Sequence, residues 1–125
     1  MATIRWEASE QKVGSIDEMD RLLDELHTRG EPILAAVELK PSGDSLTIGL
    51  GREASVLNFV SGSGNPPYFT SRGSAERDDV VWFSFMGDLS EFPMHQTVPV
   101  SAARQAMRHF WTTGKLDPGI TWDEV

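Results

Sequence analysis

Residues 15–30 read SIDEMDRLLDELHTRG and carry the clearest helix signal in the chain. Ser15 and Glu18 have the spacing of a capping box, in which the hydroxyl and the carboxylate satisfy free backbone N–H groups. Gly30 offers a left-handed stop at the other end. Apolar residues recur between them at helical spacing, namely Ile16, Met19, Leu22, Leu23 and Leu26. The stretch predicts an amphipathic helix with one buried face.

On both sides of this helix the pattern changes to short strands. Thr3 to Ala8 reads as a first strand. After the helix, three further strands are separated by turn residues such as Pro41 to Asp44; they run over Ile33 to Leu39, Leu46 to Leu50 and Ser55 to Val60. Consecutive hairpins of this kind predict an antiparallel meander. Ser61 to Pro67 is rich in Gly and Pro and is expected to be a surface loop.

The run from Val80 to Met86 is almost continuously apolar and is bounded by acidic and turn residues. Such runs are typical of strands that are covered on both faces, so we expect this one to be the central core strand. Trp82 and Phe85 would then be core residues whose truncation is costly. The stretch through Phe92 and Pro93 is expected to be an irregular connector, with one more short strand at Thr97 to Val100.

A second helix follows, with Ser101 as its expected cap and Gly114 at its end. Its apolar side consists of Ala103, Ala106, Met107, Phe110 and Trp111. The order of one strand, a helix, several strands and a helix predicts an α+β fold, with two main helices packed on one antiparallel sheet. At 125 residues the chain is expected to be a single domain over residues 1–125.

Charge restricts the classes of partner. Nineteen acidic and eleven basic residues give a formal net charge of −8, which disfavours direct binding of nucleic acid or anionic membranes and favours cationic partners. An equally simple interpretation is that this charge serves solubility alone. The chain contains no Cys, and its start, MATIRWEASE, has no signal-peptide pattern. We therefore expect a cytoplasmic protein that does not cross a membrane.

Motifs for catalysis or cofactors are weak. The three histidines, His27, His95 and His109, lack the spacing of paired ligands on a helix, so no metal site is predicted. Gly49 to Ala54 matches a relaxed dinucleotide-binding pattern, but a strand follows where a helix is required, which predicts a tight turn. Ser84 is interpreted as a small packing residue. We expect no cofactor and no enzymatic activity.

Several blocks in the second half occur in a characteristic order. They are Asn65 to Gly73, Gly87 to Pro93, Val98 to Val100, the helix from Ala102 to Thr113, Gly114, and Ile120 to Glu124. With this pattern the chain, from Ser15 to its end, resembles the first-numbered family of immunity proteins of bacterial polymorphic toxin systems, in its actinobacterial form. The resemblance implies a small α+β inhibitor that is encoded beside a toxin and binds its catalytic domain, most often a nucleic-acid deaminase and in other cases a nuclease. It supplies no catalytic residues.

The predicted mechanism is inhibition by occlusion of the basic, active-site cleft of the toxin. Residues near the long loops and the apolar run are the candidate toxin contacts: Tyr68, Phe69, Glu76, Asp78, Asp79, Asp88, Glu91 and Phe92. Two alternatives stay open. One is an accessory protein that binds a small molecule or a peptide and has no toxin partner, and the other is an enzyme of an unrecognised type.

Overall fold

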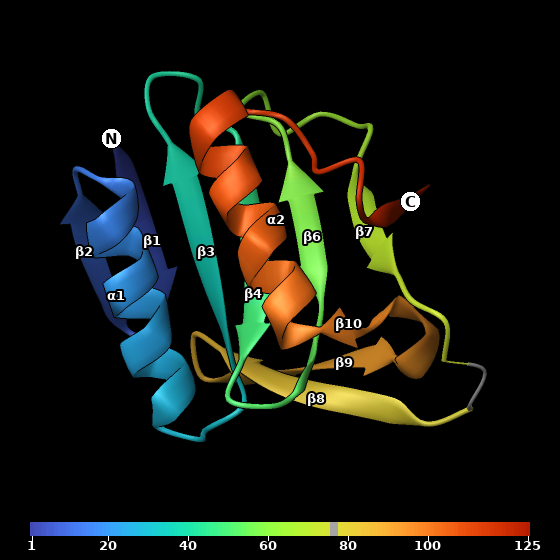
Figure 1. Cartoon of the computed structure of the whole chain (residues 1–125). Coiled ribbons are helices and arrows are strands. Elements are labelled where there is room, and N and C mark those ends of the chain that lie inside the picture. Colours follow the sequence, from blue (N-terminus) through green and yellow to red (C-terminus); the bar gives the residue numbers. More distant parts are fainter. Residues whose placement is uncertain (76–77) are drawn as a thin grey trace.

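The structure is a computed structural model of residues 1–125 and describes all of them except residues 76–77. Two helices lie against one face of a large sheet, and a hairpin runs crosswise at one end of that sheet (Figure 1). The helices of the described residues are α1 (Ile16–Thr28) and α2 (Val100–Thr113), with a 3₁₀ turn, η1 (Met94–Gln96). The strands are β1 (Ala2–Trp6), β2 (Ser9–Val13), β3 (Ile33–Leu39), β4 (Ser45–Leu50), β5 (Ala54–Ser55), β6 (Leu57–Val60), β7 (Phe69–Arg72), β8 (Val80–Phe85), β9 (Asp88–Pro93), β10 (Val98–Pro99) and β11 (Thr121–Glu124). This arrangement confirms the predicted α+β class.

The main sheet follows the order β11-β7-β6-β4-β3-β1-β2, and each of these neighbouring pairs is antiparallel. The strand predicted at Ile33 to Leu39 is confirmed with the same bounds. Strands β2, β7 and β11 were missed because their sequences are short and largely polar. The strand expected at Ser55 to Val60 is divided, since Val56 separates β5 from β6. The meander is thus extended at both edges of the sheet.

Helix α1 begins as the capping pattern predicts. The Ser15 hydroxyl accepts a hydrogen bond from the Glu18 N–H at 3.1 Å, and the Glu18 carboxylate accepts one from the Gly14 N–H at 3.3 Å. Gly30 has a φ of 76°, which confirms the left-handed stop. In the last turn of α1, His27 Nδ1 accepts a hydrogen bond from the Gly51 N–H at 2.9 Å. This bond joins α1 to the turn after β4.

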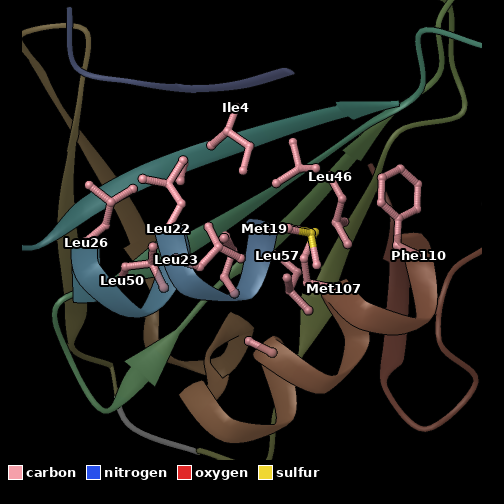
Figure 2. Close-up of a cluster of buried hydrophobic side chains, with 14 of the residues drawn as sticks. Ile4, Met19, Leu22, Leu23, Leu26, Leu46, Leu50, Leu57, Met107 and Phe110 are labelled. Carbon is pink, nitrogen blue, oxygen red and sulfur yellow. The ribbon is translucent and has the colours of Figure 1, made fainter. Parts of the chain in front are cut away.

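The main core lies between the helices and the sheet. Strand β4 turns alternate residues toward the helices, and Leu46, Ile48 and Leu50 are completely buried. Figure 2 shows the side chains of α1, α2 and the strands converging in this layer, among them Met19, Leu23, Leu26, Leu57, Met107 and Phe110. Each such fully buried side chain stabilises the fold by about 1.5–3 kcal/mol. Trp111 and Trp122 are partly buried and pack against the same core.

Helix α2 is held against α1 by charge as well as by apolar contact. Asp20 of α1 accepts a hydrogen bond from Arg108 Nε at 2.7 Å, and its backbone oxygen accepts one from Arg104 Nη2 at 3.0 Å. The predicted cap at Ser101 is wrong, because α2 already includes Ser101 and its N-cap is Pro99, which makes no side-chain cap bond. Gly114 has a φ of 73° and ends α2 in the left-handed conformation, as predicted.

Strands β8 and β9 form a hairpin, and the expectation that β8 is the central core strand is wrong. Strand β8 pairs fully with β9 but meets β3 through only one bridge, from Ile33 to Ser84. Within β8 only Phe83 is buried, whereas Trp82 is 42% exposed and Phe85 is partly buried. The region around Phe92 is the regular strand β9 and not an irregular connector. A run of apolar residues indicates that a strand is at least partly buried, but it does not show which face of the strand is covered.

The hairpin is attached through Phe83 to the sheet face that lies opposite the helices. Phe83 forms a small second core with Leu34 and Val56. Gly49 makes room for its ring, because an added Cβ at this position would lie 2.7 Å from Phe83 Cζ. Thus Gly49 serves close packing, while Gly51, at φ 89°, supplies the turn that follows. The turn predicted within Gly49 to Ala54 is confirmed, but it is confined to residues 51–53, because Gly49 and Leu50 belong to β4 and Ala54 begins β5.

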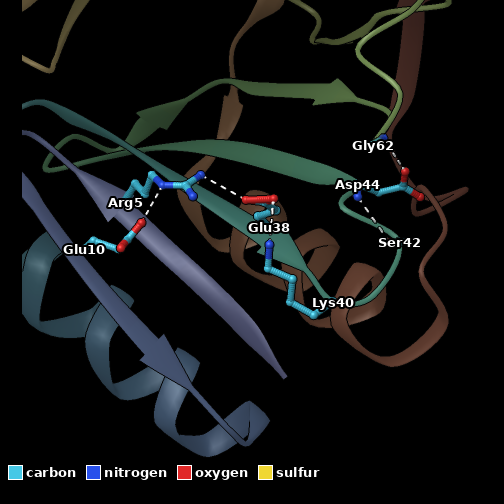
Figure 3. A network of polar contacts seen from close by, with 7 residues as sticks. All are labelled: Arg5, Glu10, Glu38, Lys40, Ser42, Asp44 and Gly62. Atoms are coloured by element: carbon cyan, nitrogen blue, oxygen red, sulfur yellow. Dashed lines mark hydrogen bonds and ion pairs between the residues drawn. The ribbon is translucent and has the colours of Figure 1, made fainter.

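Charged side chains occupy the exposed face of β1, β2 and β3 (Figure 3). Arg5 donates hydrogen bonds to Glu10 at 2.7 Å and to Glu38 at 3.0 Å, and Lys40 donates one to Glu38 at 3.1 Å. The hydrogen bond from Lys40, with that from Arg5, lowers the pKa of the Glu38 carboxyl below its ordinary value. The contribution of Glu38 to stability is consequently present above that ordinary value and is lost as the pH falls through the lowered pKa. Such exposed pairs contribute about 1 kcal/mol or less.

In Figure 3 the turn between β3 and β4 is tied to the loop after β6. Asp44 Oδ1 accepts a hydrogen bond from the Gly62 N–H at 2.8 Å, and the Asp44 N–H donates one to the Ser42 hydroxyl at 3.2 Å. The loop predicted at Ser61 to Pro67 is confirmed as irregular. No helix in the described part of the chain is long and apolar enough to cross a membrane.

Truncation of side chains on the two faces of β8 is predicted to lower stability to different extents. Phe83→Ala should lower the free energy of unfolding by about 3–5 kcal/mol, because it leaves a cavity in the second core. Trp82→Ala should lower it by only about 1 kcal/mol, because much of the indole already contacts water. Urea unfolding followed by circular dichroism measures both values. Equal losses for the two variants would contradict the assigned orientation of the hairpin.

Candidate functional site

Exposed apolar side chains concentrate on the β8–β9 hairpin. Val80 is 40% exposed, Trp82 42%, Met86 60% and Leu89 69%. The other large exposed apolar residues in the described part of the chain are scattered, and they are Met1, Val60 and Val125. We call the four exposed apolar residues of the hairpin the hairpin patch. A local group of exposed apolar side chains of this kind is typical of a binding surface.

The strand register explains why one face of the hairpin remains open. Directly opposed residues of an antiparallel pair share a face, and Trp82 is opposite Glu91 while Ser84 is opposite Leu89. The other face carries Phe83 opposite Ser90, and it packs on the sheet through the second core. Residues therefore alternate between the covered and the open face along both strands.

The tip of the hairpin is a two-residue turn made by Met86 and Gly87. Both residues have positive φ, 54° and 85°, as in a type I′ turn. Gly adopts this conformation without strain, but for Met it costs about 1–2 kcal/mol, and Asn or Asp is the usual residue there. An apolar side chain that is 60% exposed at a strained position contributes little to folding. Residues held in such strained backbone conformations cluster at functional sites.

Acidic residues surround the hairpin patch. Residues 78–93 contain four acidic residues, Asp78, Asp79, Asp88 and Glu91, and no Lys, Arg or His. All four are exposed. Glu91 lies beside Trp82 on the open face, Asp88 follows the turn, and Asp78 and Asp79 come directly before β8. Six strand residues span about 20 Å, so the carboxylates are distributed along the whole hairpin.

The predicted aromatic contacts lie in different surroundings. Phe92 is on the covered face, where its ring meets Phe83 edge-on with centroids 6.1 Å apart. Phe69 belongs to β7 and packs against Phe59, with centroids 6.3 Å apart, and the Tyr68 hydroxyl donates a hydrogen bond to the Gly64 oxygen at 2.7 Å. Strand β7 is in another part of the sheet from the hairpin (Figure 1). The structure therefore places Tyr68 and Phe69 away from the acidic candidates, and it directs Phe92, which lies in the same hairpin as those candidates, to the covered face.

Glu76 lies outside the described residues. The remaining acidic candidates are brought together on the hairpin, but the four residues of the hairpin patch were not among the predicted contacts. Three of them lie in the run from Val80 to Met86, which was interpreted as core because both of its faces are apolar in sequence. The two-residue turn at Met86 and Gly87, together with the absence of basic residues around it, was the available signal for an exposed hairpin.

The described residues offer no cluster for a metal ion, and two of their open hollows are poorly suited to a small ligand. No group of three or more His or acidic side chains among them is arranged to hold a metal ion. Two adjoining open hollows, of about 370 and 420 Å³, lie beside the start of α2 and share Gly73, Ser74, Val98 and Pro99. Arg72 and Glu53 are the charged residues in these linings, one in each hollow. Such a lining offers no set of convergent polar groups for a small ligand.

Comparison with known proteins agrees with this architecture. A search of curated proteins found no match. A family model described as "Immunity protein Imm1" matches residues 7–124, which is nearly the whole chain and includes the complete hairpin. The match extends the resemblance, which was inferred from Ser15 onward, to strand β2. The chain therefore belongs to the Imm1 immunity protein family.

Proposed function

We propose that this protein binds a cognate bacterial toxin domain through the β8–β9 hairpin and inhibits it by covering its active-site cleft. The observation that carries the proposal is the hairpin patch, an exposed apolar surface on a member of an immunity protein family. Aromatic and large aliphatic side chains that become buried on binding usually supply most of the affinity of an interface. Trp82 and Leu89, on one face, have this role in the proposal.

The acidic border of the hairpin patch favours a basic partner surface. A toxin that acts on nucleic acid needs a basic cleft for the phosphate backbone, and the exposed carboxylates of Asp88 and Glu91, which form no ion pair with any described residue, are complementary to it. The toxin is accordingly proposed to be a nucleic-acid deaminase, with a nuclease as the alternative of the same charge. In this mechanism the inhibitor is bound stoichiometrically, is not an enzyme, and acts in the cytoplasm of the producing cell.

Capture of the toxin domain encoded by the adjacent gene tests the proposal. The purified parent should form a stable complex with it and abolish its deamination of a nucleic-acid substrate. Trp82→Ala and Leu89→Ala should each weaken the complex by about 30-fold or more, because both remove apolar contact at the centre of the interface. Isothermal titration calorimetry measures the affinities.

Val60 and Val80 provide a matched control for this experiment, since they are 37% and 40% exposed on different parts of the surface. Val80→Ala should weaken the complex, and Val60→Ala should leave it unchanged. A parent protein that neither binds nor inhibits this toxin would reject the proposed function. Binding that is insensitive to all three hairpin variants would place the interface elsewhere, for instance at Tyr68 and Phe69.

The turn at Met86 allows stability and binding to be separated. Met86→Asn should raise the free energy of unfolding by about 1 kcal/mol, because Asn tolerates the positive φ of this position. The same change should weaken toxin binding by about tenfold, because it removes an exposed apolar side chain from the hairpin patch. Urea unfolding and calorimetry on the same preparation give the two values. A variant with greater stability and unchanged affinity would exclude the tip from the interface.

The carboxylates should act mainly on the rate of association. A double variant, Asp88→Lys with Glu91→Lys, should slow association by about tenfold or more and make it less dependent on salt, because exposed charges steer encounter and are screened within about 10 Å at 0.1 M ionic strength. Asp17→Lys with Glu124→Lys changes the net charge equally, and both of these exposed residues lie off the hairpin. Stopped-flow fluorescence across a salt series compares the pairs. Equal effects would assign the acidic charge to solubility or to long-range attraction alone.

A further inference from the structure

Strand β9 has an open edge. On its other side it pairs with β8, and within the described chain it pairs with no other strand. Leu89 is 69% exposed and Glu91 is also exposed, so this edge is in contact with water. Long exposed edges invite pairing with another chain, and natural proteins commonly cover them or interrupt them.

The register shows which backbone groups of β9 point outward. The Met94 N–H donates to the Asp79 oxygen at 2.9 Å, so Asp79 and Met94 are a hydrogen-bonded pair in this antiparallel ladder. Hydrogen-bonded and non-bonded pairs alternate along such a ladder. Asp88, Ser90 and Phe92 therefore direct their backbone groups toward β8.

Leu89, Glu91 and Pro93 direct their backbone groups away from β8, toward the open edge. Two features of the chain agree with this assignment. Pro93 has no N–H and falls at a non-bonded position, and the Ser84 N–H, opposite Leu89, points away from β9 and donates to the Pro32 oxygen at 2.9 Å. The open edge thus presents the N–H groups of Leu89 and Glu91 and the C=O groups of Leu89, Glu91 and Pro93.

We infer that the toxin contributes an extended segment that adds to β9 as a further strand of the sheet. This inference rests on the proposed function and specifies how the partner is held. Main-chain hydrogen bonds to Leu89 and Glu91 would supply register, and side chains of the added strand would lie beside those of Leu89 and Glu91 on the open face. The added strand would carry an apolar residue next to Leu89 and a Lys or Arg next to Glu91.

Charge distinguishes this occupant from a second copy of the chain. Two β9 edges that paired with each other would place the acidic side chains of Asp88 and Glu91 from both copies along one short ladder, without a basic residue of the hairpin to balance them. Like charges at opposed positions destabilise strand pairing. A basic segment of the partner has the opposite effect, and its apolar residues also cover the hairpin patch.

Proline substitution at the outward positions tests strand addition. Glu91→Pro removes an N–H that no described group accepts, and proline is tolerated where the N–H of an edge strand faces solvent. The variant should keep a melting temperature within a few degrees of the parent but bind the toxin domain encoded by the adjacent gene about 100-fold more weakly. Glu91→Gln removes the charge and retains the N–H, so it should lose about tenfold or less. Leu89→Pro and Leu89→Ala repeat this comparison at the second outward position.

Ser90→Pro provides the opposite control. The Ser90 N–H bonds to β8, so this variant should lower the melting temperature strongly and thereby verify the register. If Glu91→Pro binds as tightly as Glu91→Gln while the parent binds well, strand addition is wrong and the proposed function stands. If the parent does not bind the toxin at all, the proposed function fails. A parent that sediments as a dimer, and becomes monomeric in Glu91→Pro, would identify a second copy as the occupant.

Discussion

The packing of Phe83 against the sheet determines the orientation of the β8–β9 hairpin and therefore which of its faces is exposed. Its ring occupies the space left by the absent side chain of Gly49 and forms the second core with Leu34 and Val56. Because side chains alternate along a strand, burial of Phe83 turns Trp82 outward, and the antiparallel register then places Glu91 beside it. One apolar contact on the sheet face opposite the helices therefore decides which half of the hairpin is available to a partner.

The two layers of the fold have different roles. The helices and the inner face of the sheet bury a continuous aliphatic core, reinforced by the ion pairs of Asp20 with α2, and this layer stabilises the scaffold. The hairpin is attached to that scaffold by few contacts and carries a strained turn at Met86 and an open strand edge at β9. Recognition is commonly placed on such an appendage of a rigid body, because its side chains can be exposed at little cost to the main core.

Charge is also distributed unevenly between these layers. On β1, β2 and β3, acidic residues are paired with Arg5 and Lys40, so their negative charge is locally balanced. On the hairpin, Asp88 and Glu91 form no ion pair with any described residue. The net charge of −8 is therefore more than a general property of the chain, since part of it is concentrated beside an apolar surface. In the proposed complex, this combination would give a basic partner both attraction at a distance and apolar contact at short range.

Local sequence patterns were sufficient to predict the α+β class, helix α1 with its Ser15 cap, the buried side of α2, strand β3 and the membership of the immunity family. These features depend on local signals, namely periodicity, capping and turn residues, that act between near neighbours in the chain. Which face of β8 is buried, by contrast, depends on contacts between residues that are distant in the chain. Both faces of Val80 to Phe85 are apolar in sequence, and only the approach of Gly49, distant in the chain, covers one and leaves the other open. The same holds for the polar edge strands β2, β7 and β11, which are strands because a neighbouring strand satisfies their backbone groups, a condition that no local pattern records.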